Sequence, residues 1–210
     1  MAEAFVIERT SITLRLARAG DNTQIAAIWN DAVTGPNFTT DTEPRTPEDQ
    51  RAWLARHDDD HPVIVAVDED EVVAYGSLSP YRDRPAFRAT VEDSVYVKAG
   101  RRGAGLGALV LAELLRLARE RSHHAVMARI VADNEPSRRL HARLGWALVG
   151  IERATAFKHA RWHDIAIMQR LVDWPRCAEG QAARVASRRA RGSVEHGTWL
   201  ALPTNCSMRR

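Results

Sequence analysis

A seven-residue stretch, Arg101-Arg102-Gly103-Ala104-Gly105-Leu106-Gly107, has the composition of an anion-binding turn. It follows a strand-like run that ends at Val97, and it opens an apolar helical pattern. Glycines let the backbone approach a ligand closely and adopt positive φ, and the unpaired N–H groups at a helix start favour negative charge. The two arginines add cationic donors. These features predict an anion site, although a tight turn with a helix cap uses the same residue types. The spacing fits neither a Gly-x-Gly-x-x-Gly fingerprint nor a Walker loop, because no Lys-Ser/Thr pair follows Gly107.

Three further polar residues have side chains that could serve in acid–base chemistry or ligand binding. Glu92 lies on the strand before the loop, His141 lies on a later helical segment, and Asn134 stands at the start of that segment. Each also has a simpler interpretation. A strand carboxylate is commonly solvated, a lone histidine is commonly structural, and an asparagine before a helix is commonly its cap.

The elements that must position these residues follow from the hydrophobic periodicity. We expect strands at residues 12–16, 63–67, 71–78, 90–97, 125–131, 146–151 and 164–172. Helices are expected at about 21–33, 46–57, 106–121 and after Asn134. This order predicts an α/β sandwich on a mixed central sheet.

Helix boundaries are indicated by residues with specific capping chemistry. Asp21 can cap the first helix, and Thr46-Pro47-Glu48-Asp49 combines a cap, a proline at the first helical position and an acid at the third. Asn134 can cap the last helix, and Gly145 suits the position just past its end.

Side-chain alternation assigns the faces of the strand at residues 90–97. Three valines share one face, while Glu92, Ser94 and Tyr96 share the other. Asp93 interrupts the valine row, so a bulge or local exposure is expected there. In the following helix we expect one buried apolar stripe, formed by Leu106, Leu109, Val110, Leu114 and Leu117.

Composition separates the chain into a domain at residues 1–173 and a basic tail at 174–210, which we expect to be mostly disordered. The net charge is +3, but the tail holds seven arginines and two glutamates, which leaves the body at −2. A nucleic-acid-binding surface on the body is therefore not indicated.

No apolar run of 18 residues exists, and the N-terminus lacks a signal-like apolar segment. The only cysteines, Cys177 and Cys206, lie in the tail, so a cytoplasmic protein without a structural disulfide is expected.

Two of these patterns together resemble a known family. Arg102, Gly105 and Gly107 fill the pattern Arg/Gln-x-x-Gly-x-Gly/Ala, which is similar to the pyrophosphate loop of the GCN5-related N-acetyltransferases (GNAT). The segment Asn134-Glu-Pro-Ser-x-x-x-His-x-x-Leu-Gly-Trp146 resembles the second motif of that family, with His141 where many members have tyrosine. The resemblance implies a mixed, mostly antiparallel central sheet flanked by about four helices.

Four separated blocks narrow the resemblance to the phosphinothricin N-acetyltransferases, a branch that includes methionine sulfone and sulfoximine acetyltransferases. The blocks are Thr42-Glu-Pro-Arg-Thr-Pro47, Thr90-Val-Glu-x-Ser-Val-Tyr-Val97, Arg139-Leu-His-x-x-Leu-Gly-Trp146 and Phe157-Lys-His-x-x-Trp-His-Asp164. The similarity covers about residues 12–172, and the tail has no counterpart in it.

The resemblance assigns roles to residues around the cosubstrate acetyl-CoA. Glu92 would be the general base and His141 would protonate the CoA thiolate or share the base role. Backbone N–H groups of Val95, Tyr96 and Val97 would hold the thioester carbonyl. The remaining contacts to CoA would come from Arg102, Gly103, Ala104, Gly105, Leu106, Gly107, Ala108, Asn134 and Ser137.

An acidic, amino-acid-like substrate needs cations, for which the planar fork of arginine is well suited. The candidate cations are Arg82, Arg84, Arg88 and Lys158, and the pocket would be shaped by Tyr81, Phe87 and Trp162. Surface exposure of these arginines and core packing of the aromatic residues are the alternatives.

The sequence and the resemblance thus predict an N-acetyltransferase that acts directly on the amine of a small amino acid analogue, without an acyl-enzyme or a metal. The resemblance also implies a homodimer. Two alternatives stay open. One is acetylation of another amine, such as a polyamine, an antibiotic or a protein N-terminus. The other is a non-catalytic acyl-CoA-binding regulator whose basic tail contacts nucleic acid.

Overall fold

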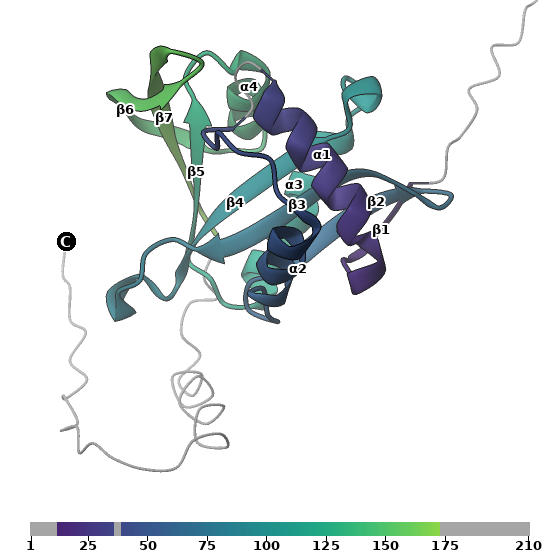
Figure 1. Cartoon of the computed structure of the whole chain (residues 1–210). Coiled ribbons are helices and arrows are strands. Elements are labelled where there is room, and N and C mark those ends of the chain that lie inside the picture. The colour runs from purple at the N-terminus through teal and green to yellow at the C-terminus, as the bar shows by residue number, and fades with distance from the viewer. Residues whose placement is uncertain (1–11, 36–38, 173–210) are drawn as a thin grey trace, which may run out of the picture. The chain divides into compact units, whose positions relative to one another are not determined.

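The computed structural model describes residues 12–35 and 39–172. These residues form seven strands and four α-helices (Figure 1). The strands are β1 (Ile12–Leu16), β2 (Val63–Asp68), β3 (Glu71–Pro80), β4 (Thr90–Val97), β5 (Ala125–Val131), β6 (Ala147–Lys158) and β7 (Arg161–Leu171). The helices are α1 (Asn22–Thr34), α2 (Pro47–Ala55), α3 (Leu106–Glu120) and α4 (Glu135–Arg143).

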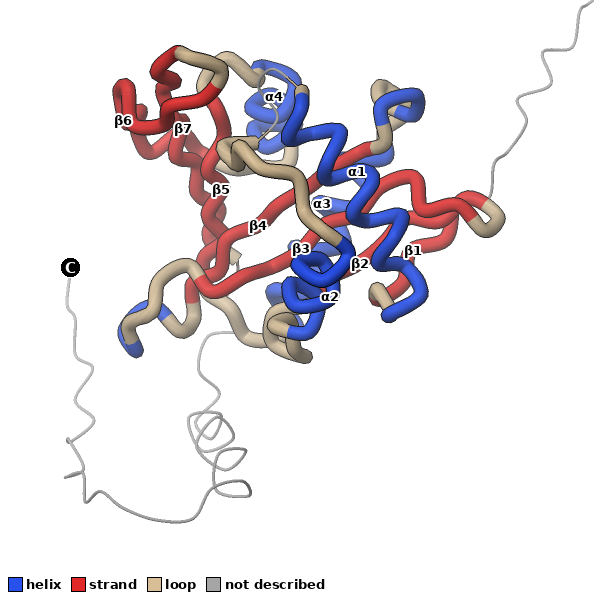
Figure 2. Tube along the Cα trace, viewed as in Figure 1, coloured by secondary structure: helices blue, strands red, loops and turns tan. Residues whose placement is uncertain are grey.

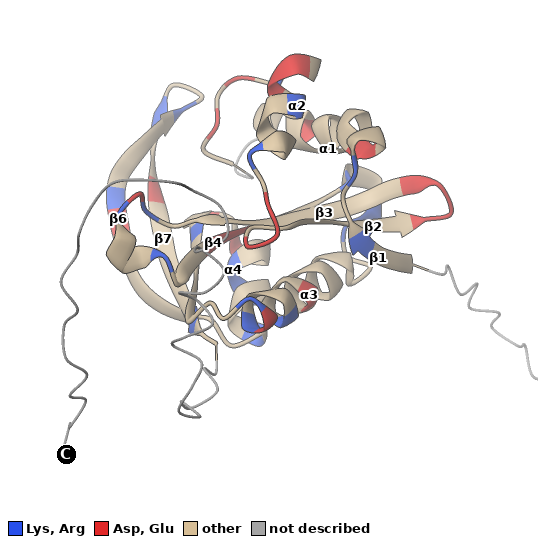
Figure 3. Ribbon diagram, turned by 90° about the horizontal axis from the view of Figure 1, so that it is seen from below, with Lys and Arg blue, Asp and Glu red and all other residues tan. Residues whose placement is uncertain are grey.

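The strands form one sheet in the order β1-β2-β3-β4-β5-β7-β6, in which only the β4–β5 pair is parallel. Helices α1 and α2 cover one face of the sheet and α3 covers the other (Figure 3). This architecture confirms the expected mixed, mostly antiparallel sheet with four helices.

Each face of the sheet has its own apolar core. On one face α3 packs so closely on β3 that a Cβ added at Gly76 would lie 2.6 Å from Val110 Cγ1. On the other face α1 packs on β2 and β3, where Tyr75 is fully buried and its ring stacks on that of Tyr96 at 5.2 Å. Tyr75, Tyr96 and Trp29 thus belong to the core on the α1 side of the sheet, and the core on the α3 side is mainly aliphatic.

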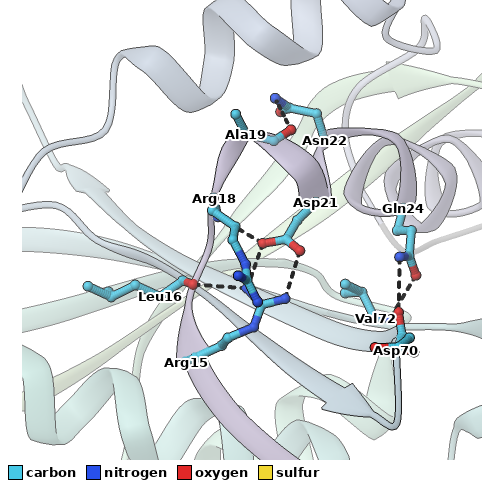
Figure 4. A network of polar contacts seen from close by, with 9 residues as sticks. All are labelled: Arg15, Leu16, Arg18, Ala19, Asp21, Asn22, Gln24, Asp70 and Val72. Carbon is cyan, nitrogen blue, oxygen red and sulfur yellow. Dashed lines mark hydrogen bonds and ion pairs between the residues drawn. The ribbon is translucent and has the colours of Figure 1, made fainter.

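The corner between β1 and α1 departs from the sequence expectation. Asp21 precedes α1, but its side chain makes no capping hydrogen bond. Instead, both of its carboxylate oxygens accept hydrogen bonds from Arg15, at 2.7 and 2.8 Å (Figure 4). The hydrogen bond from Arg15 is also the main cause that lowers the pKa of Asp21. A bidentate arginine pair is stronger than a single neutral cap, so it takes the carboxylate away from the helix N-terminus.

A second contact in the same region ties α1 to the β2–β3 hairpin. The Gln24 amide donates to the Asp70 carbonyl at 3.3 Å and accepts from the Val72 N–H at 2.7 Å (Figure 4). The predicted cap at Thr46 is confirmed, because Thr46 and Asp49 form a reciprocal capping box at the start of α2.

The parallel pairing between β4 and β5 is short. It joins residues 90–92 to residues 125–127, after which β4 and β5 diverge (Figure 2). Beyond this point β5 continues to pair with β7, and β4 continues to pair with β3. Because N–H groups alternate in direction along a strand, some of those in the last residues of β4 face the gap between the two strands.

Two elements differ in extent or packing from the prediction. β6 and β7 are longer than expected and meet at a tight turn in which His159 and Ala160 have φ of 51° and 58°. Such turns usually carry asparagine or glycine, so this one left no sequence signal. In α3, Leu109 is 41% exposed while Leu111 is fully buried, so the buried stripe is rotated toward Leu111.

The predicted tail and the segment before Ile12 lie outside the described residues. None of the helices in the described ranges is both long and apolar enough to cross a membrane.

Candidate active site

A pocket of about 350 Å³ opens on the α1 side of the sheet, where β4 and β5 diverge. Its walls come from α1, the loop before α2, and strands β4 to β7. The described residues that line it are Trp29, Thr39, Thr40, Asp41, Glu92, Ser94, Tyr96, Arg129, Thr155, Ala156 and Ile165.

Glu92 is the carboxylate that β4 places in this pocket, as its side-chain alternation predicts. Burial raises the pKa of Glu92 to about 7, against the opposing effect of the Arg129 charge. Asp93 adds a smaller increase. A carboxylate with a pKa near neutrality suits general base catalysis, because it is present as the base and still has a useful affinity for a proton.

Asp93 faces the opposite side of β4 and is not exposed, so the predicted exposure was wrong. Its pairing with β3 is regular, without a bulge, and the residue is 6% exposed. Its Oδ2 atom lies 2.9 Å from Nε2 of His141 on α4. The carboxylate is buried because a histidine 48 positions later in the sequence supplies its partner.

Both ring nitrogens of His141 face oxygen acceptors. Nε2 contacts the Asp93 carboxylate, and Nδ1 lies 2.8 Å from the Ser137 carbonyl oxygen. A carbonyl and an ionised carboxylate accept hydrogen bonds, so these two contacts favour a proton on each ring nitrogen. Burial alone would lower the pKa of His141, but Asp93 and the Ser137 carbonyl together raise it above the ordinary value. The surroundings of His141 therefore favour the protonated ring, a form that can donate a proton but cannot accept one.

The glycine-rich loop has the backbone conformation that the sequence predicted. Gly103 and Gly105 have φ of 84° and 81°, a region that side chains with a Cβ rarely adopt. Gly105 immediately precedes α3, and no side chain caps that helix. The first N–H groups of α3, which include those of Leu106 and Gly107, have no acceptor within the helix, an arrangement that favours negative charge at a helix start.

The two arginines of the loop differ in their surroundings. Arg101 forms an ion pair with Asp68, and the Arg102 Nε–H donates to the Val97 carbonyl at 3.2 Å. The second contact joins the loop to the end of β4.

Asn134 caps α4 as predicted, with its side-chain oxygen accepting from the Ser137 N–H at 3.3 Å.

The residues predicted to bind substrate do not line the pocket. Tyr81 and Phe87 form an edge-to-face pair with ring centroids 5.8 Å apart, and the Arg82 guanidinium lies over both rings. Arg84 and Arg88 are exposed in the same loop. These five residues form a cluster between β3 and β4, outside the described lining of the pocket.

The two substrate-binding candidates from the β6–β7 hairpin, Lys158 and Trp162, are also absent from the described lining of the pocket. Lys158 is 5% exposed, and its Nζ donates to the Thr39 carbonyl at 3.0 Å. It supports the loop that forms one pocket wall, and burial lowers its pKa. Trp162 is 62% exposed and its ring centroid lies 5.2 Å from that of Phe157.

Sequence reasoning missed the pocket residues that come from outside β4. Trp29 lies on α1 and Thr39 to Asp41 lie in the loop before α2, and no motif marks either segment in the sequence. One signal was present for Arg129: it is the single charged residue in the apolar run Ala125–Val131. A charge in such a strand needs a polar environment, and here the pocket provides it.

Comparison with known proteins identifies the family of the chain. Residues 25–146 match the model of the acetyltransferase (GNAT) family. The chain is 40% identical over 147 residues to a phosphinothricin N-acetyltransferase of Streptomyces coelicolor, covering 68% of this chain and 86% of the relative. It is 37% identical to an L-methionine sulfoximine/L-methionine sulfone acetyltransferase of Pseudomonas paraeruginosa, covering 80% and 99%.

A solved structure also has this fold. It is a GNAT superfamily phosphinothricin acetyltransferase from Sinorhizobium meliloti in complex with AcCoA, with a TM-score of 0.72 and 34% identity over 77% of this chain and 89% of that one. The chain therefore belongs to the acetyltransferase (GNAT) family and is an acyltransferase that uses acetyl-CoA.

Proposed function

We propose that the protein transfers an acetyl group from acetyl-CoA to the amine of a small amino acid analogue of the phosphinothricin or methionine sulfone/sulfoximine type. The observation that carries the proposal is the position of Glu92, a carboxyl with a pKa of about 7 in a pocket beside the point where β4 and β5 diverge. The names of the relatives support the substrate class.

Glu92 would act as the base in a direct transfer. An α-ammonium group has a pKa near 8, so it must lose a proton before it can attack. Glu92 accepts that proton, directly or through water, and the neutral amine forms a C–N bond with the thioester carbonyl. N–H groups of Val95–Val97 that face the gap beside β5 would stabilise the oxyanion. The C–S bond then breaks and CoA leaves as the thiolate.

The remaining predicted residues would bind and protonate CoA. The N–H groups of residues 103–108 would bind the diphosphate, with Arg102 at the rim. The acceptors around His141 favour the proton-donor role over the base role, because an imidazolium can give a proton to the thiolate but cannot take one from the amine. Asn134 and Ser137 would contact the CoA arm.

A release assay for CoA thiol tests the function. Purified protein and acetyl-CoA are combined with L-methionine sulfone, phosphinothricin, a polyamine and a peptide with a free N-terminus. We expect thiol release with the first two, and loss of most of that release in Glu92→Gln. Release only with the polyamine would favour the second candidate function, which the Asp41 and Glu92 carboxylates in the pocket support. Binding of acetyl-CoA without release from any amine would favour the regulator.

We also propose a homodimer, as the family resemblance implies, and a cytoplasmic location, as the positions of the two cysteines indicate. Light scattering coupled to size-exclusion chromatography measures the mass in solution, and a monomer at micromolar concentration would contradict the dimer.

A further inference from the structure

Arg129 is the one lysine or arginine among the described residues that line the pocket. It lies on β5 in a strand whose other six residues are all buried, whereas its own side chain is 39% exposed. The predicted substrate cations lie elsewhere, in the β3–β4 loop and under the pocket wall. Among the described lining residues there is thus one positive group, and neither the motifs nor the resemblance assigned it a function.

The sheet register places Arg129 close to Glu92. Glu92 pairs with Met127 in the parallel ladder, and Arg129 lies two residues further along β5 on the same face as Met127. The separation along the strand is roughly 7 Å, which an arginine side chain can span. Among neighbouring charges, that of Arg129 has the largest effect on Glu92. The amine and the carboxylate of an α-amino acid are attached to one carbon, so groups that recognise both must lie this near to one another.

The guanidinium of Arg129 retains donors for a ligand. Its Nη2 atom lies 2.9 Å from Oε2 of Glu152, and this is its one hydrogen bond within the described residues. Arginine has five N–H donors in a planar fork that matches a carboxylate or phosphinate. Glu152 is on the edge strand β6 and is 40% exposed, so it orients the guanidinium from the edge of the sheet without burying it.

We infer that Arg129 selects acidic acceptors by binding the carboxylate, or an equivalent anionic oxygen group, of an α-amino acid whose amine faces Glu92. This inference rests on the proposed function and adds to it the residue that distinguishes an amino acid from a simple amine. Asp41 and Glu92 would otherwise leave the pocket negative and suited to cations. The positive charge of Arg129 offsets part of that bias at the place where the acid must bind.

The test compares L-methionine sulfone with its carboxamide, which keeps the amine and replaces the carboxylate by a neutral amide. For the wild-type protein we expect KM to be about 10–100-fold lower for the acid, the usual value of a charge-assisted hydrogen bond. Arg129→Gln should raise KM for the acid to that of the amide and leave KM for the amide unchanged. Arg129→Lys should recover part of the difference, because it keeps the charge but loses the fork.

Two further variants separate recognition from a structural role. Glu152→Gln removes the same ion pair but keeps the guanidinium, so KM for the acid should not rise. Arg51→Gln removes one positive charge from the exposed surface of α2 and should change neither KM. Melting temperatures of all variants establish that each is folded.

The outcomes distinguish this inference from the function on which it rests. If Arg129→Gln keeps the wild-type ratio of KM values, or if Glu152→Gln loses the ratio equally, Arg129 does not recognise the acid. If the wild-type protein acetylates neither compound, the proposed function fails and the inference fails with it. Acetylation of both with equal KM by the wild-type protein overturns the inference alone.

Discussion

At the scale of single residues, the proposed reaction would depend on the charge states of Glu92 and His141. Burial raises the pKa of Glu92 to about 7, so at neutral pH about half of the molecules carry the carboxylate. A carboxylate with an ordinary pKa would be a poor acceptor for a proton from an ammonium group of pKa near 8. The two hydrogen-bond partners of His141 stabilise the protonated form of its ring.

The first prediction concerns the pH dependence that follows from Glu92. In the wild-type protein, kcat/KM should fall as the pH drops through about 7, because the base is protonated. Glu92→Gln should lower the rate at pH 7 by about 10²–10⁴, the usual contribution of a positioned general base. The variant should recover part of its rate above the pKa of the amine, where solution supplies the neutral form. A pH–rate profile of both proteins measures this, and a near wild-type rate for the variant at pH 7 would exclude Glu92 as the base.

At the scale of elements, β4 acts through both of its faces. Glu92 faces the pocket, while the next residue, Asp93, faces α4 and contacts His141. Because neighbouring strand residues point to opposite sides, the strand that carries Glu92 is held on its other face by the buried contact between Asp93 and His141. The same helix is close to the glycine-rich loop, since a Cβ added at Gly107 would lie 3.1 Å from Leu140 Cδ2.

The second prediction concerns the stability of the β4–α4 contact. Asp93→Asn should lower the free energy of unfolding by about 3–5 kcal/mol at pH 6, since it leaves one partner of a buried pair alone. The folded-state pKa of His141 is raised, so the stabilisation is complete below the unfolded value of about 6.5 and is lost as the pH rises through the folded value. The difference between wild type and variant should therefore shrink at pH 9. Urea unfolding at both pH values measures it, and an equal difference at the two would show that the pair is not ionic.

The third prediction concerns the loop before α3. Gly105→Val should weaken acetyl-CoA binding, because valine is strained at a φ of 81° and its side chain would occupy the space of the diphosphate. A Cβ at Gly105 meets no described atom within 4 Å, so crowding inside the protein is not the cause. Gly20→Val is the matched control, since Gly20 also has open space but no positive φ. Isothermal calorimetry measures both, and an unchanged affinity in folded Gly105→Val would refute the loop assignment.

At the scale of the whole molecule, the described residues are organised by a sheet whose middle pair of strands separates. Helices α1 and α2 lie over one face of the sheet (Figure 3). The pocket that contains Glu92 opens on this face. The loop and helix start that would bind CoA belong to α3, which packs on the other face. Two substrates could thus approach the gap between β4 and β5 from opposite sides of the sheet.

The fourth prediction concerns the end of the domain. Val172 is 3% exposed in the core beneath α3, and its N–H donates to the His124 carbonyl at 2.8 Å. We propose that the folded domain is complete at about Asp173, because the following residues offer few apolar side chains to bury. A chain that ends at Asp173 should keep its melting temperature and its rate of thiol release. A fall of more than a few degrees, or loss of activity, would assign the tail a role in the fold or the site.

The sequence by itself determined the features whose partners lie within a few positions. The capping box of Thr46 and Asp49, the cap at Asn134 and the positive φ of Gly105 follow from short-range geometry, which residue type and spacing encode directly. The face of β4 that carries Glu92 follows from the period of a strand. Together with the resemblance, these local signals were sufficient to predict the fold and the family.

Tertiary structure decided which distant side chains meet. In the sequence Asp93 only interrupts an apolar row, whereas in the structure it contacts His141, 48 positions away. Asp21 was expected to cap a helix, but Arg15 competes for its carboxylate more strongly. Arg129, within β5, lines the pocket, whereas Arg82, just after β3, lies over the rings of Tyr81 and Phe87. No periodicity encodes such pairs, because their contacts depend on the pairing of strands and the packing of helices far apart in the chain.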